Sequence, residues 1–160
     1  MQEIKIRPLT KEDFAPFGDL LDISGEPDKI INQGNCGRYH NRAGLDFLDG
    51  AAGISLFDAK PRALPYELEM MERHPLGSQA FIPMNYAPFL IIAALDNGGT
   101  PGLPMAFLST SGQAINFHRN VWHGVLTPLH GPGLFAVVDR IGEGANLEEV
   151  FFDTPYLVVS

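Results

Sequence analysis

Two short polar motifs contain the residues that could do chemistry. The first places a carboxylate, an imidazole and an amide close together, at Glu72, His74 and Gln79. Because side chains alternate along a strand, Glu72 and His74 share one face and Arg73 points to the other. The Pro-Leu-Gly triplet after His74 is typical of a chain reversal. We therefore expect Gln79 to return opposite His74 on a partner strand.

The second motif holds two further imidazoles, His118 and His123, on either side of Asn120. Imidazoles at this spacing face opposite sides of a straight strand, so they converge only if the chain turns between them. Asn120 tolerates the left-handed conformation that such a turn needs. Histidine titrates near neutral pH. The pattern predicts one shared polar site in which His74, His118 and His123 move protons.

Bulk properties favour a small-molecule protein with one domain, residues 1–160. Hydrophobic residues make up 45% of the chain and charged residues 19%, a globular composition. The net charge of −8 would repel nucleic acid and anionic membranes. The longest apolar run, 89–95, is too short to cross a bilayer. We expect a small-molecule substrate, with neither nucleic acid nor membrane as partner.

The expected compartment is the cytoplasm. Cys36 is the only cysteine, so no disulfide can form within the chain, which fits a reducing environment. The first residues lack the basic-then-apolar layout of a signal peptide.

Substrate-binding candidates lie in and around the two motifs. A guanidinium suits a small carboxylate because it donates two parallel hydrogen bonds. The arginines that fit this role are Arg38, Arg73 and Arg119, although strand alternation turns Arg73 away from His74. Gln79 could bind substrate as well, and Phe81 and Trp122 are expected to form pocket walls or core.

The local patterns predict an all-β fold. A short helix is expected at 11–17, with Thr10 as its N-cap. Strands are expected at 4–8, 37–41, 54–59, 66–74, 79–84, 89–95, 105–109, 113–118, 122–127, 134–140 and 149–152. Short strands separated by turns are typical of a sandwich or barrel.

Two apolar runs, 89–95 and 134–138, show no alternation of polar and apolar residues. Both are therefore expected to be buried on both faces, in the interior or at a subunit interface. The chain has more apolar strand than a small barrel needs, and this predicts a homodimer.

The two motifs together resemble the two-part cupin signature. More narrowly, the stretches 72–83 and 116–123 are similar to the ureidoglycolate lyase family, and the match extends over almost the full chain. The segment 8–19, the Arg38-Tyr39-His40 triplet and Asp139-Arg140 fit that family too. The resemblance implies a cupin-type β-barrel or jelly roll with a short N-terminal helix.

The chain departs from the general cupin pattern at its ligand positions. Glu72 stands where the first histidine ligand is usual, and Gln79 stands where a glutamate is usual. The resemblance implies a metal set of Glu72, His74, Gln79 and His123, with nickel as the ion associated with the family. The donor set alone would equally accept Zn, Mn or Fe. A neutral amide at Gln79 removes one negative charge, so we expect weaker metal binding than in a typical metallo-cupin, or direct substrate binding by the same residues.

The reaction implied by the resemblance is cleavage of (S)-ureidoglycolate to glyoxylate and urea, in allantoin degradation and purine nitrogen metabolism. Elimination from this hemiaminal needs a base for the hydroxyl proton and an acid for the departing nitrogen. His118 is expected to be the free base or acid, because it matches no ligand position. Two alternatives stay open: another metal-dependent cupin enzyme, such as a dioxygenase or isomerase, and a non-catalytic module that binds a small acid.

Overall fold

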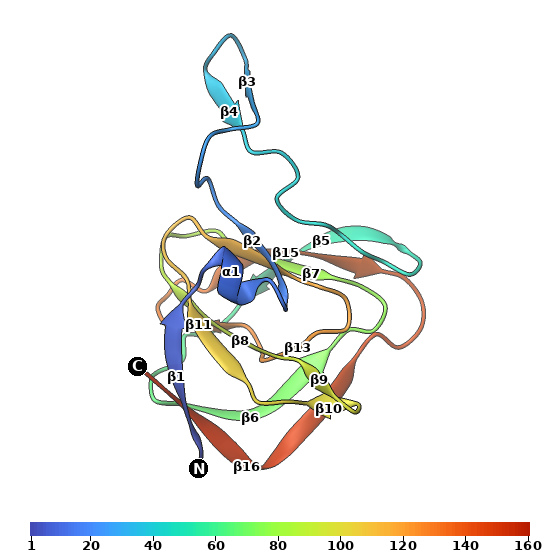
Figure 1. The fold of residues 1–160 in the computed structure, drawn as a ribbon. Coiled ribbons are helices and arrows are strands. Elements are labelled where there is room, and N and C mark those ends of the chain that lie inside the picture. Colours follow the sequence, from blue (N-terminus) through green and yellow to red (C-terminus); the bar gives the residue numbers. More distant parts are fainter.

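Two β-sheets face each other across the core of the computed structural model, which describes residues 1–160 (Figure 1). The first sheet has the strand order β11 (Met105–Leu108), β1 (Glu3–Pro8), β16 (Glu148–Val159), β6 (Tyr66–Arg73), β13 (Trp122–His123), β8 (Phe89–Ala94) and β14 (Thr127–Pro128). Because β8 also pairs with β11, six of these strands close into a barrel.

The second sheet packs against one side of this barrel. Its order is β2 (Gly18–Leu21), β12 (Ala114–Phe117), β7 (Gln79–Pro83), β15 (Leu134–Ile141) and β5 (Ala51–Asp58). Two small hairpins complete the strands, β3 (Lys29–Ile31) with β4 (Cys36–Arg38) and β9 (Asp96–Asn97) with β10 (Thr100–Pro101). The predicted all-β architecture is confirmed, and the fold is cupin-like.

Strand β8 separates two apolar cores, which confirms that 89–94 is buried on both faces, whereas Leu95 at the end of the predicted run is exposed. Phe89, Ile91 and Ala93 point into the layer between the two sheets. The alternate residues Leu90 and Ile92 point into the closed barrel instead, where Trp122 and Met71 also lie. A strand with apolar cores on both faces has no use for polar alternation, and for this reason its sequence is continuously apolar.

Strand β15, in the second predicted run, is buried on one face only within a single chain. Phe135 and Val137 are buried between the sheets, but Ala136 and Val138 on the opposite face remain partly exposed. Further along the same face, Arg140 is buried against Asp49 of the loop before β5.

Strands β6 and β7 do not pair with each other, so the expected return of Gln79 opposite His74 is wrong. β6 pairs with β13 and β16, whereas β7 pairs with β12 and β15 in the other sheet. The connection crosses between the sheets and is held by the 46–48 loop, through the Ser78 N–H to Asp46 O bond and the Gly77–Phe47 bridge.

Local signals fix the helix and the turns. Thr10 caps α1 (Lys11–Phe14) as predicted, because its hydroxyl accepts a hydrogen bond from the Asp13 N–H at 3.2 Å. The helix is shorter than expected because Pro16 has no backbone N–H to continue the hydrogen bonding of the helix. Asn120 adopts the left-handed conformation, with φ of 69°, as predicted.

Other element bounds shift from the prediction. The expected strand at 122–127 is divided into β13 and β14, and the expected strand at 149–152 extends to residue 159 as β16, with a register shift between Phe151 and Tyr156. Strands β2 and β3 carry polar residues and no apolar alternation, and the sequence patterns did not indicate them.

The structure contains no helix with the length and apolar composition needed to span a bilayer.

Candidate active site

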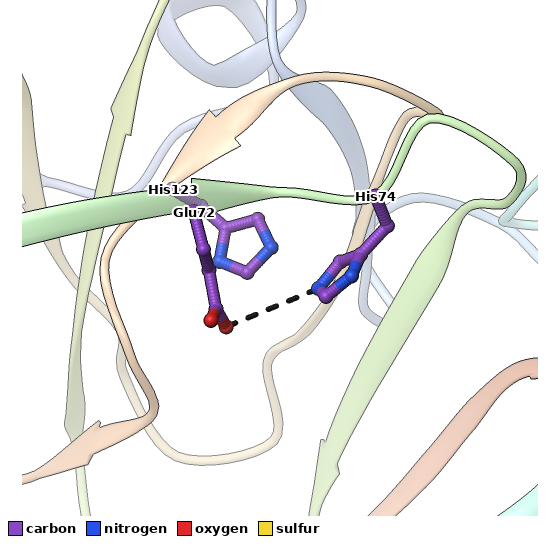
Figure 2. A group of neighbouring side chains, drawn as sticks. All are labelled: Glu72, His74 and His123. Atoms are coloured by element: carbon purple, nitrogen blue, oxygen red, sulfur yellow. Dashed lines mark ion pairs between the residues drawn. The ribbon is translucent and has the colours of Figure 1, made fainter. Parts of the chain in front are cut away.

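The side chains of Glu72, His74 and His123 converge on one point (Figure 2). Glu72 and His123 are direct cross-strand partners on β6 and β13. Their strand neighbours Met71 and Trp122 lie in the closed barrel, so alternation sends Glu72 and His123 to the other face, between the two sheets. The oxygen and nitrogen atoms that the three residues offer lie within 4.8 Å of one another.

His123 is fixed as a neutral imidazole. Its Nδ1–H donates to the Gly124 carbonyl at 2.9 Å, because a carbonyl oxygen can only accept. The ring is fully buried and stacks on Phe117, with ring centroids 4.4 Å apart and planes 8° apart. Burial, and then the neighbouring His74, lower the pKa of His123 to about 3. The lone pair of Nε2 is therefore free, and this atom is buried without a hydrogen-bond partner.

His74 is held in the same way by a distant loop. Its Nδ1–H donates to the Asn146 carbonyl at 2.8 Å, and the Asn146 side-chain oxygen accepts from the Leu76 N–H at 2.7 Å. The Nε2 atom is buried without a hydrogen-bond partner and lies 3.9 Å from Glu72 Oε1. The two imidazole centroids are 5.1 Å apart. Both histidines thus present an Nε2 lone pair to the same space.

Glu72 is the acidic member of the group. Burial raises the pKa of its carboxyl above the ordinary value, a positive charge on His74 would lower it, and the charge of Glu149 raises it further. Glu149 stands directly across from Glu72 on β16. A carboxyl with a raised pKa takes up a proton more readily near neutral pH, which suits both proton transfer and neutralisation by a cation.

Gln79 reaches the layer between the sheets from β7. Its Nε2–H donates to Asp139 Oδ2 at 3.1 Å, which fixes the orientation of the amide. The other end, Oε1, is buried and has no hydrogen-bond partner. Gln79 stands across from Phe117, the residue whose ring stacks on His123. Asp139 therefore leaves a carbonyl-type oxygen available on the inner face of the second sheet.

These unpaired atoms fit a divalent metal ion. Buried polar atoms almost always have a partner, so unpaired ones call for an explanation. Here His74 Nε2 and His123 Nε2 lie beside the carboxylate of Glu72, and Gln79 Oε1 is the unpaired atom on the facing sheet. Two neutral imidazoles with a carboxylate form a set that holds Zn²⁺, Ni²⁺, Mn²⁺ or Fe²⁺. The group could hold a metal ion, and nothing in its geometry selects one of these metals.

His118 lies apart from this group. It shares the strand face of Asn116, and its Nε2 lies 3.3 Å from Asp19 Oδ1 on the outer side of the second sheet. Asp19 also accepts from Asn116 and from the Gly44 N–H, and these hydrogen bonds keep the pKa of its carboxyl low against the opposing effect of burial. The turn at Asn120 forms as predicted but does not bring His118 round to His74 and His123.

The predicted substrate-binding residues are divided among several places. Arg73 points away from His74, as strand alternation indicated: its guanidinium pairs with Asp96 and Glu148 and lies over the ring of Trp122. The Trp122 indole N–H donates to the same Asp96 carboxylate, so this residue also stays on the far face.

The other predicted residues differ in how close they lie to the site. Arg38 is on the projecting hairpin, away from β6 and β13 (Figure 1). Arg119 lies beside the His74 loop, where it donates to the Pro75 carbonyl and pairs with Asp46. Phe81 forms part of the wall, with its ring centroid 6.5 Å from that of His123.

Sequence reasoning did not identify the residues that orient the site. Asn146 and Gly124 hold the imidazoles through their backbone carbonyls. Every residue has a backbone carbonyl, so the residue type does not indicate this role. Asp139 could have been found, because it alternates with the buried Phe135 and Val137 and so faces inward as a charged residue among apolar ones.

The fold and the site define a cupin-like protein with a buried His/His/Glu group. The model of the family "Ureidoglycolate lyase" matches residues 1–159. Ureidoglycolate lyase of Rhodobacter capsulatus is 57% identical over 159 residues, 99% of each chain. Ureidoglycolate lyase 2 of Rhizobium meliloti is 48% identical over 99% of this chain and 98% of that one. The Mesorhizobium japonicum ureidoglycolate lyase is 49% identical over 98% of this chain and 97% of its own length. The chain belongs to the ureidoglycolate lyase family.

The Asp139–Gln79 bond can be tested by metal binding. In Asp139→Asn the Gln79 amide loses its charged acceptor and can turn its oxygen toward the new amide. We expect Ni²⁺ and Zn²⁺ affinities to fall about 10- to 100-fold, as is typical when a group that orients a metal ligand is removed. Isothermal titration calorimetry measures this, with the exposed Asp58→Asn as control. Equal affinities in the two variants would contradict the role of Asp139.

The buried neutral His123 makes stability depend on pH. Its folded pKa of about 3 lies below the ordinary 6.5, so the unfolded chain binds more protons between these values. Stability is therefore full above pH 6.5 and falls as pH decreases toward 3, by at most about 1.4 kcal/mol per pH unit.

His123→Phe should remove this contribution. We expect a shallower dependence of the free energy of unfolding on pH between 6.5 and 4, measured by urea denaturation of the metal-free proteins. The exposed His40→Phe is the control. Identical slopes in wild type and His123→Phe would show that His123 is not buried as a neutral ring.

Proposed function

We propose that this chain is an enzyme that cleaves (S)-ureidoglycolate to glyoxylate and urea, a step in allantoin degradation and purine nitrogen metabolism. Family membership over nearly the whole chain supports the substrate. The observation that supports the chemistry is the convergence of the partly buried Glu72 and His74 with the buried His123. A cytoplasmic location is part of the proposal, and the free, exposed thiol of Cys36 is consistent with it.

The substrate carries a hydroxyl, a carboxylate and a urea nitrogen on one carbon. In the elimination the hydroxyl loses its proton, the carbon–oxygen bond becomes double, the carbon–nitrogen bond breaks, and the departing nitrogen gains a proton. No nucleophilic side chain is required. The site must therefore accept one proton and return one, and it must hold the carboxylate in place.

Glu72 and His74 are the residues that we assign to proton transfer. Burial raises the pKa of the Glu72 carboxyl and so makes it a stronger base than an ordinary carboxylate, and His74 Nε2 lies 3.9 Å from it, a gap that the substrate or one water could bridge. His123 binds and orients but does not carry the proton, because its low pKa makes the protonated form too costly. The proton-carrying role predicted for His118 has no support from its position beside Asp19.

A divalent cation, when bound by Glu72, His74 and His123 with Gln79, would supply Lewis acidity that lowers the pKa of the substrate hydroxyl. Nickel is the ion that the family resemblance favours. Metal-assisted and direct acid–base elimination would use the same side chains, and removal of the metal distinguishes them.

Arg119 is our candidate for the substrate carboxylate. It lies at the rim, next to the loop that follows His74, and it is partly exposed. The Arg73 guanidinium is engaged on the far face. We expect Arg119→Ala to raise KM for ureidoglycolate at least about 10-fold with a smaller change in kcat, because one charge-assisted bidentate contact is lost. The exposed Arg62→Ala is the control, and an unchanged KM in Arg119→Ala would remove Arg119 from substrate binding.

Glyoxylate release from ureidoglycolate tests the proposal directly. Purified protein should release glyoxylate and urea in equal amounts. His74→Ala should lower kcat/KM by roughly 10²- to 10⁴-fold, the usual contribution of a positioned acid–base group, whereas His130→Ala, in a loop, should match wild type. No release by the wild type would refute the substrate assignment.

Chelation before the assay separates the two routes. Loss of activity with a strong chelator and recovery on adding Ni²⁺ would favour the metal-assisted route. Activity that is insensitive to the chelator would leave the acid–base pair of Glu72 and His74.

A further inference from the structure

Arg73 and Trp122 do not reach the site, yet each adjoins residues that form it. Arg73 stands between Glu72 and His74, and Trp122 precedes His123 on β13. Strand alternation turns both side chains to the far face of the first sheet. There the guanidinium carbon of Arg73 lies 4.4 Å from the centroid of the Trp122 ring. Cation–π attraction between the two side chains thus joins β6 to β13 directly behind the site.

Asp96, on the β9–β10 hairpin, fixes the position of the Arg73 guanidinium. Its Oδ1 atom accepts from Arg73 Nη1 at 2.9 Å and from the indole N–H of Trp122 at 2.8 Å, and its Oδ2 atom accepts from the Gly99 N–H at 3.1 Å. The hydrogen bond from Trp122, and then the one from Gly99, lower the pKa of the Asp96 carboxyl, so this group stays charged at neutral pH. The guanidinium therefore lies between a fixed carboxylate and a fixed ring.

The remaining face of the guanidinium binds Glu148. Arg73 Nε donates to Glu148 Oε2 at 2.6 Å. An ion pair between two exposed side chains stabilises a fold little, because water screens it and both side chains must be ordered. This pair differs, since the Arg73 side chain is only 13% exposed and is already held on its other side. Arg73 can therefore fix the position of Glu148.

Glu148 follows the loop that holds His74. This loop, residues 142–147, connects β15 to β16 along the outside of the molecule (Figure 1). Asn146 in the loop accepts the Nδ1–H of His74 on its main-chain oxygen at 2.8 Å. Every other residue of the loop is exposed. Apolar burial therefore contributes little to the conformation of the loop, and polar contacts must position it.

Charged side chains hold the two ends of this loop. At its start, the Arg140 guanidinium donates to the Glu143 carbonyl at 2.7 Å. At its end, Glu148 is the first residue of β16 and pairs with Arg73 of β6. The end of a strand opens more readily than its middle. The ion pair between Arg73 and Glu148 secures this terminal pair of residues, two positions from Asn146.

We propose that Arg73 is a positioning residue for His74. From the far face of the sheet it holds Glu148, and through Glu148 it keeps the Asn146 carbonyl against His74 Nδ1. His74 then presents the lone pair of Nε2 to the site. Without this acceptor, the imidazole is free to rotate or to carry its proton on Nε2. The expected effect on turnover rests on the proposed function, whereas the effect on His74 does not.

Hydrogen exchange of the imidazole Nδ1–H groups, followed by NMR in the metal-free protein, tests the positioning itself. Arg73→Met keeps an unbranched side chain that can pack on Trp122, but it removes both ion pairs. Because the loop then opens more often, the His74 Nδ1–H should exchange at least about 10-fold faster than in the wild type. The His123 Nδ1–H is the internal reference, since its acceptor is the adjacent Gly124 carbonyl in the buried core. Its exchange rate should not change.

Two further variants separate the parts of the contact. Glu148→Gln removes the ion pair at the loop end and should also speed exchange of the His74 Nδ1–H. Arg73→Lys keeps the positive charge but cannot bind two carboxylates in a fixed geometry, so its exchange rate should lie between those of the wild type and Arg73→Met. Both variants also test the proposal if Arg73→Met does not fold.

Steady-state kinetics with ureidoglycolate measure the consequence for turnover. Arg73→Met should lower kcat about 10- to 100-fold, as is typical when a group that orients an active residue is lost. KM should stay nearly unchanged, because Arg73 lies on the far face of the sheet and does not touch substrate. Arg62→Met is the matched control. Arg62 also lies over an aromatic ring, that of Tyr66 at 5.8 Å, but it forms no ion pair with the 142–148 segment, so both measurements should match the wild type.

Unchanged exchange of the His74 Nδ1–H in Arg73→Met and Glu148→Gln would overturn the proposal. An equal increase for His123 would overturn it as well, because the whole site and not the His74 loop would then have loosened. A wild type that releases no glyoxylate would refute the proposed function instead, and the exchange rates would still decide whether Arg73 positions His74.

Discussion

Two backbone carbonyls determine what this site can do. The carbonyl oxygens of Gly124 and Asn146 accept the Nδ1 protons of His123 and His74, so both rings keep an unprotonated Nε2 directed at Glu72. A metal ion or a substrate proton needs these lone pairs. If either ring carried its proton on Nε2, the site would offer a donor where the proposed chemistry needs an acceptor.

The facing sheets supply this arrangement from segments far apart in sequence. β6 and β13 are adjacent in the first sheet, which aligns Glu72 with His123. The second sheet brings Phe117, whose ring covers one face of the His123 imidazole. Packing against an aromatic ring removes water from the imidazole, and this desolvation keeps His123 neutral. The apolar core thus sets the electrostatics of the polar site.

Strand alternation predicted from sequence that Glu72 and His74 share a face and that Arg73 does not, because alternation is a local property of one strand. Which strands pair is not local, and for this reason the expected pairing of Gln79 with His74 was wrong. His74 and Asn146 also lie far apart in the sequence, so no local motif could predict their contact. His118 shows the same limit: the turn was predictable, but the direction of the side chain depends on the sheet beneath it.

The measurement that tests the central claim most directly is the ¹⁵N chemical shift of the imidazole nitrogens in the metal-free protein. The account predicts that His74 and His123 both show a protonated Nδ1 and an unprotonated Nε2 at neutral pH, and that His123 keeps this state down to about pH 4. Adding a divalent cation should shift only the two Nε2 resonances. A protonated Nε2 on either ring, or a doubly protonated His123 at neutral pH, would contradict it.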